Sequence, residues 1–464
     1  MAKGEKMNEY LYWNYNLKIV RYPGNIINLS INMNRMNRHV MKEDIQQYRI
    51  NETAAEIIKL VDGTNTYNDI IRLLCAKYGE ESASIKKKLD AFFEIISKQY
   101  ALKVITQHDP IERNVVDMHK KVVSPMVASI EITNKCNIRC VHCYGNFGEI
   151  PYEIMDINNV KKILNDLKKI GVRIIEITGG EATTHPQIES IMSHALALGF
   201  DQVSLLTNGV KISDRLMEIL EKNKKQVYVQ IDLHSLREDY FSWFTKTPNI
   251  LEKVKYNIIK LAKKGILLRV ATILTPKNID EIVDIADWVH NLGVARYAVS
   301  PVVSLGRAND QDRNNQLYLD TNDALRAEEQ LQKIVSKYDN FLNIITSNFD
   351  KQINCGCITS HIVINSKGYI KICTMDDMSY CNGSIGNVLE ENIEHIFERN
   401  ADLLNVIYTT KAPKMHSSEC RECENAGYCN GCLLRGIIKA KEKKEECLWY
   451  KNIVPQIIKE AFNV

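Results

Sequence analysis

The sequence lacks a strong excess of charge of either sign, and it lacks long apolar runs. Its formal net charge is only +3 at pH 7, and no face is basic enough to favour nucleic acid. No segment approaches the roughly 18 apolar residues that a membrane-spanning helix needs, and the first residues lack the apolar core of a secretion signal. These absences argue against nucleic-acid-binding, membrane and secreted proteins, and we expect a cytoplasmic protein.

Cysteine, by contrast, is plentiful. The chain has 13 cysteines, most of them in close clusters after residue 350, and in a reducing compartment such clusters serve as metal ligands rather than disulfides. Three others, Cys136, Cys140 and Cys143, lie in one loop directly after the alternating run of residues 127–133. Three convergent thiolates bind a soft metal and leave one metal position open for another group. Structural zinc is the alternative, but it is usually closed by four ligands, and no fourth cysteine lies nearby.

From residue 127 to about residue 308, apolar runs of strand length alternate with amphipathic helical patterns. Predicted strands lie at 127–133, 172–178, 201–206, 226–232, 267–273 and 294–300. Predicted helices lie at 157–170, 185–198, 213–222, 250–264 and 279–292. Such alternation requires parallel strands joined by crossover helices. Polar motifs then fall at the strand ends, where glycines permit close backbone approach and a carboxylate can hold an ammonium group.

The cysteine loop, with His142 inside it, resembles the signature of radical S-adenosylmethionine (SAM) enzymes. The Gly-Gly-Glu turn after the second strand and residues 306–308 after the sixth resemble further motifs of that family. The resemblance implies an α/β fold with a partial (β/α)6 barrel, in which Cys136, Cys140 and Cys143 hold a 4Fe–4S cluster and SAM binds its open iron. One electron then cleaves SAM to a 5′-deoxyadenosyl radical, which abstracts hydrogen from a substrate.

The same resemblance implies a set of SAM contacts along the strand ends. They are Gly179, Gly180, Glu181, Asn208, Asp232 and Arg269. Glu181 would receive the amino group of SAM. The group that neutralises the SAM carboxylate is undecided, because Thr245 and Lys246 occupy the approximate position where most relatives carry an arginine. Arg269 in the fifth strand is the candidate, and an outward-facing residue paired with a helix carboxylate is the alternative.

The first hundred residues show three short β-type runs followed by three helical patterns, which is typical of a winged helix. Predicted strands lie at 17–20, 26–31 and 46–50. The first predicted helix runs from Asn51 to about residue 62, the second carries Ile70, Ile71 and Leu74 and ends near Gly79, and the third covers about 82–98. Cys75 lies among apolar residues and is expected to be a core thiol.

Residues 49–63 and 67–71 resemble the PqqD-like domain (RiPP recognition element), a family that binds the leader segment of ribosomally made precursor peptides. The resemblance implies that a leader adds as a strand to an exposed edge, which we place at about residues 45–50. A DNA-binding winged helix is the alternative, although basic residues are sparse on its recognition helix.

The cysteines of the last hundred residues form two blocks. They are Cys355, Cys357 and Cys373, followed by Cys420, Cys423, Cys429, Cys432 and Cys447. Interleaved, the blocks can make two four-thiolate sites, and a zinc ribbon is the alternative for the Cys-x2-Cys pairs.

The blocks resemble the SPASM domain, which holds two auxiliary 4Fe–4S clusters. The resemblance implies one cluster on Cys355, Cys357, Cys373 and Cys432, and another on Cys420, Cys423, Cys429 and Cys447. Because one residue separates Cys355 from Cys357, a first cluster with three thiolates and an open iron is the alternative. Cys381 matches no ligand position, so we expect a spare loop thiol, with replacement of Cys355 as the alternative.

The parts together resemble maturases of ribosomally synthesised, post-translationally modified peptides (RiPPs), of the sactipeptide or ranthipeptide synthase type. Predicted boundaries are 1–106 (leader recognition), 107–126 (linker), 127–308 (barrel), 309–350 (helical connector), 351–450 (SPASM domain) and 451–464 (tail helix). The resemblance implies a precursor peptide as partner, a flavodoxin or ferredoxin-type electron donor, three 4Fe–4S clusters with SAM, and Cys thioether cross-links as product. Alternatives are carbon–carbon cross-linking, backbone excision or rearrangement, formylglycine-type sulfatase maturation and, outside enzymes, a DNA-binding iron–sulfur redox sensor.

Overall fold

The structure is a computed structural model that divides into two compact units, Met1–Val122 and Val123–Val464. The residues it describes are 8–22, 26–32, 45–110, 115–119, 125–309, 314–344, 353–376, 378, 385–443 and 446–463. Cys381, predicted to be a spare loop thiol, lies outside these ranges.

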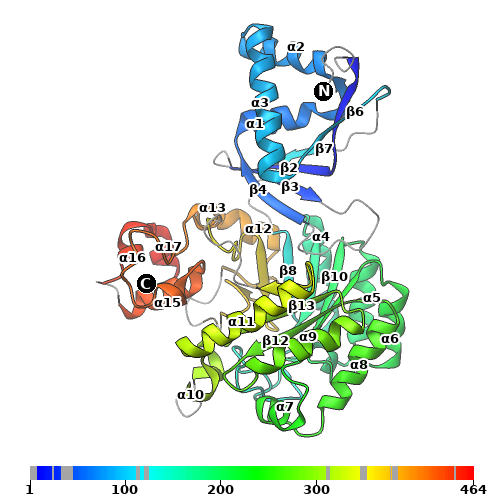
Figure 1. The fold of residues 1–464 in the computed structure, drawn as a ribbon, viewed down its shortest axis with the longest axis vertical. Coiled ribbons are helices and arrows are strands. Elements are labelled where there is room, and N and C mark those ends of the chain that lie inside the picture. Colours follow the sequence, from blue (N-terminus) through cyan, green and yellow to red (C-terminus); the bar gives the residue numbers. More distant parts are fainter. Residues whose placement is uncertain are drawn as a thin grey trace. The chain divides into compact units, whose positions relative to one another are not determined.

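The first unit packs helices against two small sheets (Figure 1). Its strands are β1 Tyr10–Trp13, β2 Asn16–Tyr22, β3 Ile26–Asn32, β4 Ile45–Ile50, β5 Asp62–Thr66, β6 Val104–Gln107 and β7 Val115–His119. Its helices are α1 Glu52–Leu60, α2 Tyr67–Tyr78 and α3 Ser82–Tyr100. One sheet has the order β4-β3-β2-β7 and the other β5-β1-β6. Every predicted strand and helix is therefore present, and within the described residues β4 is the edge strand that the sequence predicted.

Local chemistry sets the helix ends of this unit. The side chain of Asn51 accepts a hydrogen bond from Ala54 N at 2.8 Å and so caps α1. Thr66 and Asp69 form a reciprocal capping box at the start of α2, which ends at Gly79 with a left-handed φ of 66°. Cys75 packs against the hydrophobic core of the unit, as predicted.

The predicted linker at 107–126 is wrong in part. It contains β7, which pairs in parallel with β2. An edge strand has a solvated side, and Val116 of β7 is 53% exposed, so the segment shows no clean alternation of apolar and polar residues. The unpredicted β5 has the polar sequence Asp-Gly-Thr-Asn-Thr, and only its pairing with β1 makes it a strand.

The second unit is built on a nine-stranded sheet with the order β14-β13-β12-β11-β10-β9-β8-β15-β16. The strands are β8 Val127–Glu131, β9 Ile174–Thr178, β10 Gln202–Thr207, β11 Val227–Asp232, β12 Leu267–Leu274, β13 Arg296–Pro301, β14 Leu342–Ile344, β15 His361–Ile364 and β16 Ile370–Lys371. Strands β8 to β13 are the six predicted ones, and they pair in parallel. The expected α/β architecture is thus confirmed.

The helices between these strands pack along the outside of the sheet, except for α7, which lies at one end of it (Figure 1). They are α4 Ile157–Lys169, α5 Ile188–Ala197, α6 Asp214–Lys222, α7 Glu238–Thr245, α8 Leu251–Lys263 and α9 Ile282–Asn291. Helix α7 was not predicted. Its buried residues Tyr240, Phe241 and Phe244 do share one face, but the helix is only eight residues long. The helix predicted at 279–292 begins with a short 3-10 turn, Ile279–Glu281, before α9.

The remaining elements complete the second unit. They are α10 Asn314–Leu317, α11 Thr321–Lys337, α12 Ile393–Arg399, α13 Ala401–Thr409, α14 Ala426–Cys429, α15 Leu433–Glu442, α16 Leu448–Asn452 and α17 Gln456–Ala461. The predicted helical connector holds α10 and α11, but it also holds strand β14, which pairs with β13. Strand β15 pairs in parallel with β8, so the cysteine-rich region extends the barrel sheet beyond its first strand.

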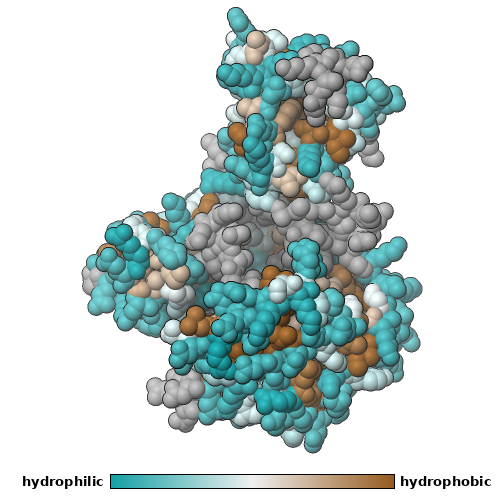
Figure 2. Space-filling view, viewed as in Figure 1, coloured by the Kyte–Doolittle hydropathy of each residue, from teal (hydrophilic) through white to brown (hydrophobic). Residues whose placement is uncertain are grey.

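The surface in Figure 2 is mainly hydrophilic, and its hydrophobic side chains form small groups. Leu325 and Val335 are exposed apolar residues on α11. Among the helices that the structure describes, none has the length and apolar character needed to cross a membrane.

Candidate metal and cofactor site

Cys136, Cys140 and Cys143 lie in the loop that follows β8, at the carboxyl edge of the parallel sheet. Burial raises the pKa of the Cys136 thiol to about 11. Burial also raises the pKa of Cys140, and the charges of Cys136 and Cys143 add to that effect. The three sulfurs are therefore close enough to repel one another when ionised, and a bound cation would remove that penalty. Within the described residues, no three His, Cys, Asp or Glu side chains gather tightly enough to hold a single metal ion.

The Gly-Gly-Glu turn supports the backbone of this loop. Gly180 N donates to Thr133 O at 2.8 Å, and Glu181 N donates to Lys135 O at 2.8 Å. A Cβ atom on Gly180 would lie 2.5 Å from Lys135 O, and one on Gly179 would lie 2.2 Å from Thr133 O. Both glycines are thus needed for contact between two loops of the chain, a role in addition to the predicted contact with SAM.

The carboxylate of Glu181 is buried and held from two sides. Its oxygens accept hydrogen bonds from Thr207 Oγ1 at 2.7 Å, from Asn208 N at 2.6 Å and from the Thr183 hydroxyl at 2.7 Å. Burial raises the pKa of Glu181, and these donors oppose the shift. Asn208 in turn donates from Nδ2 to Asn137 Oδ1 at 2.7 Å, inside the cysteine loop. The structure therefore brings Glu181 and Asn208 to the cysteine loop.

Asp232 and Arg269 lie close together on neighbouring strands. Arg269 donates from Nε to Gln230 Oε1 at 2.9 Å, and its guanidinium lies 5.7 Å from the ring centre of Tyr228. Burial raises the pKa of Asp232 to about 6, while the charge of Arg269 lowers it. Arg269 thus contacts the same side of β11 that carries Asp232.

An aromatic wall lines the other side of the cysteine loop. The His142 ring stacks on Phe244 of α7 at 4.6 Å between centroids, and it meets His234 edge-on at 5.3 Å. Burial lowers the pKa of His142 to about 4, so the ring is neutral at pH 7. The last turn of α7 also accepts from the loop, because Val141 N donates to Phe244 O at 2.9 Å. Sequence reasoning missed this wall together with α7.

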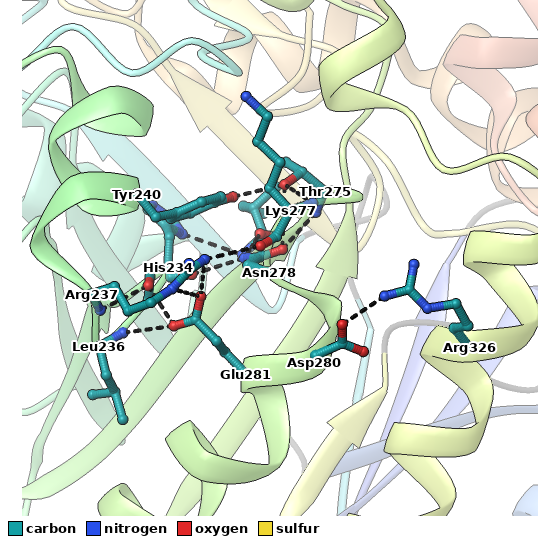
Figure 3. A network of polar contacts seen from close by, with 12 residues as sticks. His234, Leu236, Arg237, Tyr240, Thr275, Lys277, Asn278, Asp280, Glu281 and Arg326 are labelled. Carbon is teal, nitrogen blue, oxygen red and sulfur yellow. Dashed lines mark hydrogen bonds and ion pairs between the residues drawn. The ribbon is translucent and has the colours of Figure 1, made fainter.

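A polar network fixes the segment that carries His234 (Figure 3). Asn278 Nδ2 donates to His234 O at 2.8 Å, and Asn278 Oδ1 accepts from Thr275 N at 2.8 Å. Glu281 accepts from Ser235 Oγ at 2.5 Å and from Arg237 Nε at 2.7 Å. The loops after β11 and β12 are therefore tied together behind the aromatic wall. No motif in the sequence indicated this link, because Asn278 lies 44 residues from His234 and Glu281 lies 46 residues from Ser235.

The cysteines of the first predicted auxiliary set lie near one another. A hydrogen bond with Cys357 raises the pKa of the Cys355 thiol, and a hydrogen bond with Cys355 raises that of Cys432. Burial raises the pKa of Cys373, and the charges of Cys432 and Cys355 add to the effect. These thiols come from loops far apart in the sequence.

The second predicted set lines a cavity of about 480 Å³ in the last part of the chain. Cys420, Cys423, Cys429 and Cys447 all contribute to its wall, together with Trp449. Burial raises the pKa of Cys429 to about 12, and the charges of the other three thiols act on it in the same direction. A cavity walled by four thiols fits an iron–sulfur cluster by the chemistry of its donors.

Two family models match the chain. The Radical SAM superfamily model matches residues 130–289. The model described as coenzyme PQQ synthesis protein D (PqqD) matches residues 39–100. The first covers the cysteine loop and strands β9 to β12, and the second covers β4 and the three helices of the first unit.

Similar proteins span most of the chain. The antilisterial bacteriocin subtilosin biosynthesis protein AlbA of Bacillus subtilis is 28% identical over 419 residues, which cover 89% of this chain and 91% of AlbA. The sporulation killing factor maturation protein SkfB of B. subtilis is 25% identical over 279 residues, covering 59% of this chain and 64% of SkfB. The crystal structure of Streptococcus suis SuiB bound to precursor peptide SuiA has a TM-score of 0.62 at 16% identity, covering 97% of this chain and 99% of SuiB.

The family models cover the two places where the sequence predicted function, and the structure places Glu181 and Asn208 against the three-cysteine loop that the first model spans. A 4Fe–4S cluster and SAM are the cofactors that this family implies, and three thiols at the end of β8 are a donor set that suits such a cluster. The chain is a radical SAM enzyme with an N-terminal PqqD-like domain, related to AlbA and SkfB.

Proposed function

We propose that this enzyme modifies a ribosomally made precursor peptide that it recognises through a leader segment. The observation that carries the proposal is the presence, on one chain, of a PqqD-like unit with the edge strand β4 and a barrel with a three-cysteine loop. An edge strand can accept an extended peptide through backbone hydrogen bonds. Tethering by the leader raises the effective concentration of the remaining peptide at the barrel.

The relatives support a peptide substrate. AlbA and SkfB are described as proteins of bacteriocin biosynthesis and killing-factor maturation, and SuiB has been crystallised with its precursor peptide. The described basic residues of α2 and α3 are partly engaged in ion pairs, such as Arg72 with Asp69 and Lys88 with Glu80. This weakens the alternative of a DNA-binding redox sensor, whose helix would need free cations.

In the proposed site, each group has a task that suits its chemistry. Cys136, Cys140 and Cys143 would hold the cluster, the anchored Glu181 carboxylate would receive the amino group of SAM, and Arg269 would neutralise its carboxylate. When bound, the cluster and SAM supply a carbon radical that abstracts one hydrogen atom from the peptide. The aromatic wall of His142 and Phe244 excludes water from one side of the loop.

We propose Cys thioether formation as the reaction. A peptide cysteine loses its thiol proton, a second residue loses one hydrogen atom to the 5′-deoxyadenosyl radical, and a sulfur–carbon bond forms. One electron must then leave the peptide. The two auxiliary cysteine sets would each hold a 4Fe–4S cluster that can take this electron, and a flavodoxin or ferredoxin-type protein would supply the electron that starts the reaction.

The test is a reaction of the anaerobically reconstituted enzyme with the peptide encoded beside its gene, SAM and dithionite. We expect 5′-deoxyadenosine, a peptide lighter by two hydrogen atoms and a cysteine that no longer reacts with an alkylating agent. A protein with Cys136, Cys140 and Cys143 replaced by Ala is the matched control and should yield none of these. Formation of 5′-deoxyadenosine with a peptide whose cysteines all stay alkylatable would exclude thioethers and favour carbon–carbon linkage. Absence of SAM cleavage by the reconstituted protein would refute the whole proposal.

Leader recognition is tested separately. A leader segment added as a free peptide should bind the full-length enzyme and compete with the intact precursor. A core peptide without its leader should be modified much more slowly, because it lacks the tether. Equal rates for core peptide and full precursor would contradict a recognition role for the first unit.

A further inference from the structure

The short turn Gly306–Asn309, which follows β13, is pressed against the cysteine loop. Arg307 N donates to Cys143 O at 3.0 Å. Gly306 has a φ of +55°, and a Cβ atom there would lie 2.4 Å from Cys143 O and 2.4 Å from Tyr144 O. Glycine is thus required at 306 for the backbone of this turn to reach the loop carbonyls. The turn therefore places the next residue, Arg307, directly beside the predicted cluster ligands.

The guanidinium of Arg307 binds the loop at two further points. Nε donates to Cys140 O at 3.1 Å, and Nη1 and Nη2 donate to Phe147 O at 3.2 and 3.3 Å. Only 17% of the Arg307 side chain is exposed. The planar fork of an arginine can span two carbonyls in this way, whereas a lysine ammonium acts as a single point charge.

Among the residues that the structure describes, Glu149 compensates the positive charge of Arg307 only in part. Its ion-pair partner Glu149 lies at 3.7 Å and is itself 67% exposed, so water screens the carboxylate more than it screens the guanidinium. The charge reaches the loop directly, because the guanidinium donates hydrogen bonds to the backbone carbonyls of Cys140 and Phe147. The loop therefore experiences a net positive potential from this side chain.

We propose that the partly buried charge of Arg307 raises the reduction potential of the cluster held by Cys136, Cys140 and Cys143. One-electron reduction adds one negative charge to a cluster that already carries three thiolates. A fixed cation beside the loop favours the more negative state, as net charge and hydrogen bonding do at iron–sulfur sites in general. Arg307 acts through the loop and is a positioning residue. The proposal needs the cluster but not the peptide substrate.

The experiment is a redox titration with dithionite, without peptide, followed by electron paramagnetic resonance of the reconstituted full-length protein. Parallel titration of the protein with Cys136, Cys140 and Cys143 replaced by Ala identifies the auxiliary signals, which then serve as internal references. The variants are Arg307→Gln, which removes the charge, Arg307→Lys, which keeps it, and Glu149→Gln, which removes the counter-charge. Arg326→Gln is the matched control, because it removes an arginine on α11 that pairs with Asp280.

The expected midpoint potential of the loop cluster falls in Arg307→Gln, stays near that of the unmodified protein in Arg307→Lys and Arg326→Gln, and rises in Glu149→Gln. Unchanged potentials in both Arg307→Gln and Glu149→Gln would overturn the proposal, as would equal shifts in Arg307→Gln and Arg326→Gln. If Arg307→Gln cannot retain the cluster, Glu149→Gln decides alone, because its exposed site threatens neither folding nor the loop. These outcomes are independent of whether a peptide is modified.

Discussion

Lys371 Nζ lies 2.8 Å from Glu131 Oε1, and each of the two side chains is only 5% exposed. Glu131 ends β8, which leads into the cysteine loop, whereas Lys371 belongs to β16 of the cysteine-rich region and comes shortly before Cys373. Lys371 also donates to Thr374 O at 3.2 Å. Burial raises the pKa of Glu131, and the charge of Lys371 opposes that shift. The pair is thus a buried connection between the two parts of the chain that carry the predicted clusters.

Removal of one partner from this pair should be strongly destabilising. Lys371→Met leaves an uncompensated buried carboxylate, at a cost of about 3–5 kcal/mol. The double variant Lys371→Met with Glu131→Leu should recover most of that loss, because two apolar groups need no partner. Anaerobic thermal unfolding of the two single variants and the double variant measures the coupling. If the single losses simply add in the double variant, the two charges do not stabilise each other.

Much of the second unit could be predicted from its sequence, because strands β8 to β13 are buried and their alternation with helices is regular. The pairing of Val127 with His361 could not be predicted, since those residues are far apart in the chain and only tertiary packing sets their register. The Glu131 and Lys371 contact, 240 residues apart, has the same origin. The cysteine loop and Glu181 were predictable because their motifs are local, whereas the helix that supplies Phe244 has only eight residues, too few for a clear period.

Gly180→Ala should remove the loop cluster while leaving the auxiliary sites intact. The added Cβ would lie 2.5 Å from Lys135 O and 2.6 Å from Asn134 O, so the backbone just before Cys136 would have to move. Gly199→Ala is the matched control: nothing lies within 4 Å of its Cβ, and only its φ of +67° is unfavourable. Iron content and the resonance signals of each variant measure the result. Loss of the loop signal in both variants, or in neither, would contradict this role of Gly180.

Asp232→Asn should stabilise the protein at high pH. Burial raises the pKa of Asp232 from its ordinary value of 3.8 to about 6, so the unfolded chain ionises this group more readily than the folded one. Its contribution to stability is fully present below pH 4 and is lost as the pH rises through about 6. The variant should therefore exceed the original protein by roughly 1–3 kcal/mol at pH 8 and by little at pH 4.

Thermal unfolding without added SAM at the two pH values tests this expectation. Asp214→Asn is the control of opposite sign, because a hydrogen bond from Lys260 lowers the pKa of Asp214. That variant should gain no stability at pH 8. If Asp232→Asn gains the same stability at both pH values, the pKa of Asp232 is not raised in the folded protein.

His142→Phe should make the protein more resistant to mild acid. Burial lowers the pKa of His142 from 6.5 to about 4, so between these values the unfolded chain binds a proton that the folded protein does not. Stability is therefore lost as the pH falls from 6.5 towards 4, by roughly 3 kcal/mol in full. Phenylalanine keeps the stacking surface for Phe244 and has no proton to bind, so the variant should lose less stability than the original protein between pH 7 and pH 5.

His234, whose pKa burial also lowers, keeps its own share of the acid sensitivity in both proteins. Exposed His416 supplies the control, since His416→Phe changes no buried ring. If the original protein and His142→Phe lose the same stability between pH 7 and pH 5, the folded ring of His142 takes up a proton at pH 5 as readily as the unfolded one. The interpretation of a neutral, buried aromatic wall beside the cysteine loop would then have to be abandoned.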